Sequence, residues 1–116
     1  MSELIDRIVA SIVAAEETAR KIKPKQKGHT HSLSILVDKL TVVDFANNEP
    51  HAKLFALTIY NDGDSEVYVS VNKYERGAPL KPHEVLNIRF DDAVIERLYL
   101  DVDEGKSTTV RVFGTY

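Results

Sequence analysis

His29 and His31 are the residues whose type and spacing come nearest to a metal site. Side chains two positions apart on a β-strand point to the same face, and imidazole nitrogens are common zinc ligands, so this pair could form a chelate. A complete site needs further ligands, but residues 32–37, which follow, are serines and aliphatic residues. We therefore expect solvated linker histidines that hold no metal, and we expect no other cofactor.

The acidic residues fall where turns are expected. Asp62 and Asp64 flank Gly63, and a hairpin turn explains all three because the calcium loop with its terminal glutamate is absent. Carboxylates at 91–92 and 101–104 could do acid/base chemistry, but they lie at predicted strand ends, where such residues form turns. The chain has no cysteine, Gly-rich phosphate loop or nucleophile elbow. We therefore predict that it is not an enzyme.

The tyrosines offer a possible binding platform. Aromatic side chains on one face of a sheet can stack on sugars or bases, although tyrosine is also an ordinary half-buried strand residue. Packing in the core or at an interface is the favoured interpretation. The residues are Tyr60, Tyr68, Tyr74, Tyr99 and Tyr116.

A short basic segment is the strongest charge run. Between positions 20 and 27 five of eight residues are basic and none is acidic. The segment could bind phosphates or an acidic protein surface, or it could be a solvated linker. The formal net charge of −3 argues against nucleic acid as the partner. The basic residues are Arg20, Lys21, Lys23, Lys25 and Lys27.

Residues 1–23 are predicted to form an amphipathic α-helix that ends before Pro24. Its mixed polar face and its lack of an aromatic anchor argue against a membrane surface, and interrupting charges argue against a signal peptide or a transmembrane span. The seam keeps heptad register through to Ile22, which favours self-association over docking on the chain's own sheet or on a partner. Isoleucine at both seam positions in the N-terminal half favours three or four helices over two, and we expect a trimer. The seam residues are Ile5, Ile8, Ile12, Ala15, Ala19 and Ile22.

The rest of the chain shows the alternation of β-strands. Residues 24–32 contain no apolar residue and are predicted to be a basic linker. Residues 33–116 then carry about seven short strands separated by turn residues, and the hairpin through residues 61–64 is the most secure. This pattern predicts a mainly β fold, an antiparallel β-sandwich or jelly-roll-like domain behind one N-terminal helix.

Several strand segments have sequences similar to those of a known class of proteins. They are Asn61-Asp62-Gly63, the run Val-Tyr-Val-Ser-Val-Asn at 67–72, Leu-Lys-Pro-His-Glu-Val-Leu-Asn-Ile at 80–88, and Val-Arg-Val-Phe-Gly-Thr-Tyr at 110–116. With the helix and linker, the chain resembles small virion proteins of tailed bacteriophages, such as capsid decoration proteins and head fibres. The resemblance covers most of residues 54–116, although His83 stands where glycine is expected. It implies a homotrimer in the virion that is attached to capsid or tail proteins.

Two other functions compete with the virion role. A carbohydrate-binding β-sandwich module would present Tyr68, Tyr74 or Tyr99 on one open face. A cupin-like metalloenzyme would use the His29-Thr30-His31 segment, which resembles the opening of a cupin metal motif but lacks the glutamate that should follow.

Overall fold

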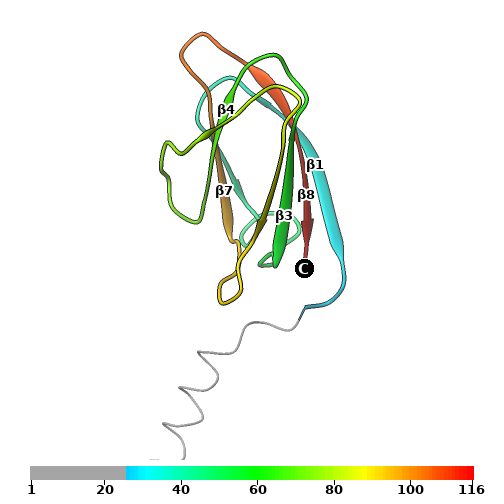
Figure 1. Cartoon of the computed structure of the whole chain (residues 1–116). Coiled ribbons are helices and arrows are strands. Elements are labelled where there is room, and N and C mark those ends of the chain that lie inside the picture. Colours follow the sequence, from blue (N-terminus) through cyan, green and yellow to red (C-terminus); the bar gives the residue numbers. More distant parts are fainter. Residues whose placement is uncertain (1–25) are drawn as a thin grey trace, which may run out of the picture.

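The computed structural model describes residues 26–116, which form eight β-strands and no helix (Figure 1). The predicted helix of residues 1–23 with its seam, and Arg20, Lys21, Lys23 and Lys25 of the basic segment, lie outside the described residues. No helix in the described part is long and apolar enough to cross a membrane. The strands are β1 Thr30–Val37, β2 Thr41–Asp44, β3 Ala56–Asn61, β4 Val67–Val71, β5 Pro79–Leu80, β6 Val85–Arg89, β7 Arg97–Asp101 and β8 Thr108–Thr115.

The strands form two four-stranded antiparallel sheets packed face to face. Sheet A has the order β1-β8-β3-β6, and sheet B has the order β2-β7-β4-β5. Consecutive strands mostly lie in different sheets, and this order is that of an eight-stranded jelly roll. The prediction of a mainly β, sandwich-like fold is therefore confirmed for the described residues.

The core fills the space between the sheets because alternate side chains of each strand point inward. In β8, for example, Val110 and Val112 are buried while Arg111 and Phe113 are exposed. Phe45 is the largest fully buried side chain, and it lies just beyond β2. The buried apolar residues are Val37, Phe45, Leu54, Leu57, Ile59, Val67, Leu80, Ile95, Leu98, Leu100, Val102, Val110 and Val112.

The hairpin predicted through residues 61–64 is wrong. Strands β3 and β4 flank this segment, but β3 pairs with β6 and β8 in sheet A, whereas β4 pairs with β5 and β7 in sheet B. Gly63 does not have the positive φ that a type I′ turn needs. It is required for space, because a Cβ there would lie 2.1 Å from Thr108 Oγ1 and 2.7 Å from the Thr109 nitrogen.

Asn61 fixes this crossing between the sheets from inside the core. Its fully buried side-chain amide donates hydrogen bonds to the carbonyl oxygens of Ser65 (2.8 Å) and Leu80 (2.9 Å). Its Oδ1 accepts one from the Thr108 hydroxyl (2.6 Å). Asn61 therefore ties β3 and β8 of sheet A to β5 of sheet B.

One predicted boundary changes in the structure, and one predicted loop is found. Strand β1 begins at Thr30, so the last residues of the predicted 24–32 linker belong to the sheet, where they pair with the end of β8. The stretch 72–84 is the expected long loop with a weak edge, the two-residue β5. His83, in the place where glycine was expected, has a φ of 65°, in the left-handed region that favours glycine.

Candidate functional site

The outer face of sheet A is the open surface of the sandwich. Its outward side chains form rows that run across β1, β8, β3 and β6 in the observed register. One row is Ser34, Arg111, Tyr60 and Val85, and the next is Ser32, Phe113, Thr58 and Asn87. The outward residues of β1 and β6 are exposed, as are those of β8 up to Phe113, so no described segment covers this face.

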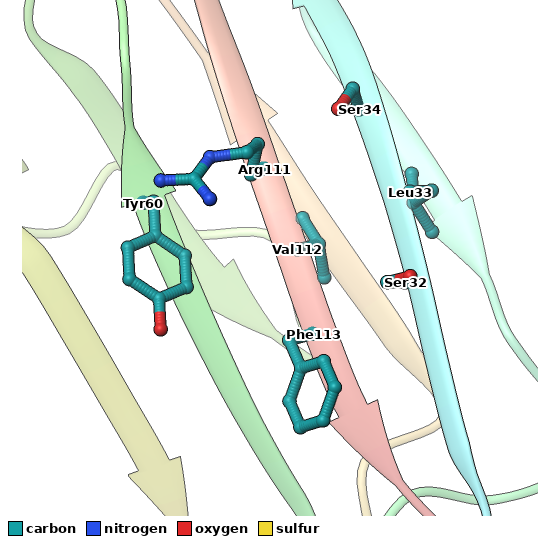
Figure 2. Close-up of a pocket in the computed structure, with 7 residues that line it drawn as sticks. All are labelled: Ser32, Leu33, Ser34, Tyr60, Arg111, Val112 and Phe113. Carbon is teal, nitrogen blue, oxygen red and sulfur yellow. The ribbon is translucent and has the colours of Figure 1, made fainter.

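A shallow hollow of about 460 Å³ lies on this face beside β1 (Figure 2). It forms because the outward side chains of β1, Ser32 and Ser34, are small while the larger Tyr60, Arg111 and Phe113 come from the neighbouring strands. Phe113, at the edge of the hollow, is 42% exposed. The hollow therefore combines an apolar ring, two hydroxyls and a guanidinium.

Arg111 is held in place by two partners. Its guanidinium carbon lies 4.5 Å from the centre of the Tyr60 ring, and Figure 2 shows it reaching across from β8 to β3 above that ring. Its Nε and Nη2 donate hydrogen bonds to the Asp62 carboxylate. This ion pair raises the pKa of the Arg111 guanidinium above its ordinary value, so the residue stays charged.

The outer face of sheet B carries three of the five tyrosines, and the loop of residues 72–78 covers part of this face. Tyr68 on β4 and Tyr99 on β7 are half-buried, and Tyr74 lies on the loop of residues 72–78 with 44% of its surface exposed. The Tyr74 and Tyr99 rings lie 6.0 Å apart. The three residues thus lie on one side of the sandwich, the arrangement that the carbohydrate-binding alternative requires, and none of them is a fully buried core residue.

The loop of residues 72–78 is bonded to sheet B. The Tyr74 hydroxyl donates a hydrogen bond to Asp101 (2.8 Å), and this bond raises the pKa of Tyr74. Arg76 donates to Asp103 (2.7 Å) and lies 4.1 Å above the centre of the Tyr68 ring. The stacking face of Tyr68 is therefore occupied by the chain itself.

The two candidate metal ligands are not brought together at a site. The His29 ring packs edge-on against Tyr116 at 5.4 Å, and the His31 ring packs against Phe45 at 6.4 Å. In the part of the chain that the structure describes, no group of three His, Cys, Asp or Glu side chains is placed to hold a metal ion. These histidines therefore have a packing role beside aromatic rings.

Lys27 is the one residue of the basic segment within the described range. It lines a second hollow of about 290 Å³ at the end of the sandwich where the described chain begins. Phe55 and Tyr116 supply the apolar wall of this hollow, and His51 and Lys53 are exposed at it. The structure thus places one basic residue next to an apolar surface.

The sequence prediction missed Arg111, Phe113 and the two serines of the sheet A hollow. A signal was available, because residues 108–115 alternate buried and exposed positions, and every outward position of a central strand must lie on one face. The partners of Arg111 could not be predicted in this way. Asp62 lies 49 positions earlier in the chain, and only the sheet register brings it near.

Comparison with known proteins gives a neighbour among solved structures, and no match among protein-family models or curated proteins. Among solved structures, the coat protein of Tobacco streak virus aligns with 81% of this chain and 91% of that chain, at 8% sequence identity and a TM-score of 0.37.

Proposed function

We propose that this chain is a non-enzymatic structural protein of a virion, most closely a capsid decoration or head and tail accessory protein of a tailed phage. The observation that carries the proposal is the eight-stranded jelly roll, whose strand order occurs in viral capsid domains, together with its uncovered sheet A face. That face presents tyrosine and arginine, the residue types enriched at the centres of protein interfaces.

The N-terminal helix supplies the assembly step of this proposal. A seam of Ile5, Ile8, Ile12 and its continuation would join three copies, and each sandwich would then project from the trimer. The basic segment that follows the helix would meet an acidic surface of the capsid or tail.

Carbohydrate binding is the alternative, and the gathering of Tyr68, Tyr74 and Tyr99 on one face is the observation in its favour. A stacking platform needs free ring faces, however, and Arg76 already lies on the Tyr68 ring. Glycan-array binding that is lost on Tyr74→Ala or Tyr99→Ala would favour the alternative over the virion role.

The virion role is tested by mass spectrometry of gradient-purified particles of a virus that encodes this chain. We expect the chain to stay with the particles at a fixed ratio to the major capsid protein. The Ile8→Asp variant should lose most of this association because three-fold attachment multiplies weak contacts. A chain that is absent from purified particles would contradict the proposal.

A further inference from the structure

Strand β1 forms an unusual edge of sheet A. It is eight residues long, lies at one end of the strand order β1-β8-β3-β6, and runs along the outer margin of the sandwich (Figure 1). Its sequence, Thr-His-Ser-Leu-Ser-Ile-Leu-Val, contains no Asp, Glu, Lys, Arg or Pro. Edge strands normally carry such residues, or are short, because unpaired backbone groups otherwise bind other strands.

The other three edges are protected in these ways. Strand β2 has four residues and ends in Asp44, which pairs with Arg97, and β5 has two residues and includes Pro79. Strand β6 has five residues and ends in Arg89. The contrast marks β1 as the edge whose backbone is open to a further strand.

The backbone groups available on β1 can be assigned from the ladder. His29 and Tyr116 exchange both backbone hydrogen bonds, each at 2.9 Å. Bonded and non-bonded pairs alternate along an antiparallel ladder, so the even-numbered residues of β1 direct their N–H and C=O groups away from β8. Among the described residues no backbone partner is found for these groups. The residues are Thr30, Ser32, Ser34 and Leu36.

We propose that β1 pairs antiparallel with β1 of a second copy across a two-fold axis at Ser34, which makes one continuous eight-stranded sheet. Both strands are uncharged, so self-pairing brings no like charges together, and an isologous contact needs no second surface. The nearest charge in the central row, Arg111, is neutralised by Asp62.

This register also places an apolar side chain at the β1 border of the sheet A hollow. With Ser34 opposite the second copy's Ser34, Leu36 of each copy faces Ser32 of the other, in the row that contains Phe113. Leu36 is 63% exposed and Phe113 42% exposed, and this arrangement places the two apolar side chains on either side of the small Ser32. On the inner side Leu33 faces Ile35, and both are only partly buried in the single chain.

Cysteine cross-linking tests the contact in the full chain, which has no cysteine of its own. In Ser34→Cys the two thiols sit on directly opposed residues whose Cα atoms are about 5.5 Å apart, within disulfide range. In the matched control Ser32→Cys, on the same strand and face, the two introduced cysteines are about 13 Å apart along the strand. Mild oxidation should give a covalent dimer at least tenfold more abundant for Ser34→Cys.

A backbone variant gives an independent readout. Ser34→Pro removes an N–H that points away from β8, so the ladder inside sheet A stays intact while the outer pairing is lost. The readout is a second disulfide, formed in a mixture of two chains of which one carries Leu33→Cys and the other Ile35→Cys. Adding Ser34→Pro to both chains should abolish this cross-link. Adding Val85→Pro, on the β6 edge, should leave it unchanged. Equal cross-linking of Ser34→Cys and Ser32→Cys, or none for Ser34→Cys, overturns the proposal. The Ser34→Cys disulfide needs only the β1 edges and does not depend on the helix. A negative cross-linking result therefore counts against β1 pairing and leaves the proposed trimer untouched.

Discussion

The outer faces of the two sheets carry the same three residue types in different arrangements. On sheet A, Arg111 lies over Tyr60 and pairs with Asp62. On sheet B, Arg76 lies over Tyr68 and pairs with Asp103. In sheet A the arginine belongs to a central strand, whereas in sheet B it belongs to the loop of residues 72–78.

This difference decides which face is available. A strand arginine covers one ring and leaves the rest of the sheet open, so a hollow remains beside β1. Arg76 holds the loop of residues 72–78 against sheet B, and the hydrogen bond from Tyr74 to Asp101 attaches the loop at a second point. The loop of residues 72–78 therefore covers part of sheet B, over β4 and β7, whereas no described segment crosses the outer face of sheet A.

Asn61→Ala should destabilise both sheets together, and it is the largest loss of stability that we predict. It removes the buried amide that joins the sheets and leaves the Leu80 carbonyl and the Thr108 hydroxyl without their partner. We expect a loss of about 3 kcal/mol in the free energy of unfolding, measured by urea denaturation. Thr58→Ala, which removes only an exposed bond to Asn87, should cost less than about 1 kcal/mol.

Asp103→Asn should release the loop of residues 72–78 from the outer face of sheet B and leave sheet A unchanged. Loss of the Arg76 ion pair frees the loop of residues 72–78, so trypsin should cleave after Arg76 up to roughly fivefold faster. Asp62→Asn is the matched control, because Arg111 stays inside a central strand when it loses its carboxylate. Faster cleavage after Arg111 in that control would contradict the distinction between the two faces.

Tyr74 gives the sheet B cover a dependence on pH. Its pKa lies above the ordinary value of 10.0, chiefly because its hydroxyl donates to Asp101, with desolvation and the negative charge of Asp101 adding to the shift. A raised pKa in the folded state means that the contact stabilises the fold fully below pH 10.0 and is lost as the pH rises through the raised value. Ultraviolet titration, with Tyr74→Phe as the reference, should give a midpoint above 10.0 that falls toward 10.0 in Asp101→Asn.

Phe113→Thr should have the smallest effect on the single chain. The ring lies on the open face, and we expect a change below about 0.5 kcal/mol in the free energy of unfolding at low protein concentration. Its neighbour Val112 is buried, and Val112→Ala should cost more than about 1 kcal/mol. Similar costs for both variants would show that Phe113 belongs to the core and not to an interface.

Alternation predicted most of the strands because it depends on local burial. Residues 33–37 and 108–113 have inward and outward side chains at the expected positions, and the loop of residues 72–84 lies where glycine and prolines predicted it. The placement of Tyr68, Tyr74 and Tyr99 on one side of the sandwich was expected only under the carbohydrate-binding alternative. The contact of Arg76 with the Tyr68 ring could not be predicted, because a loop's path over a sheet depends on contacts distant in sequence.

The false hairpin shows where local signals fail. Asn61-Asp62-Gly63 has the composition of a tight turn, yet Asn61 is used for its buried amide and Gly63 for its lack of a Cβ. Both residue types have two physical uses, and only the tertiary structure selects between them. The same limit hid the Arg111 site, whose partners come from β3 and the residue after it.

Static light scattering of the full chain over a range of concentrations tests the central claim that this protein is an assembling structural subunit. One copy has a mass of 13.0 kDa, and we predict about three times that mass, rising further where β1 edges pair. Ile8→Asp should remove the trimer while the circular dichroism of the sandwich stays unchanged. A mass that stays at 13.0 kDa at every concentration would contradict the account.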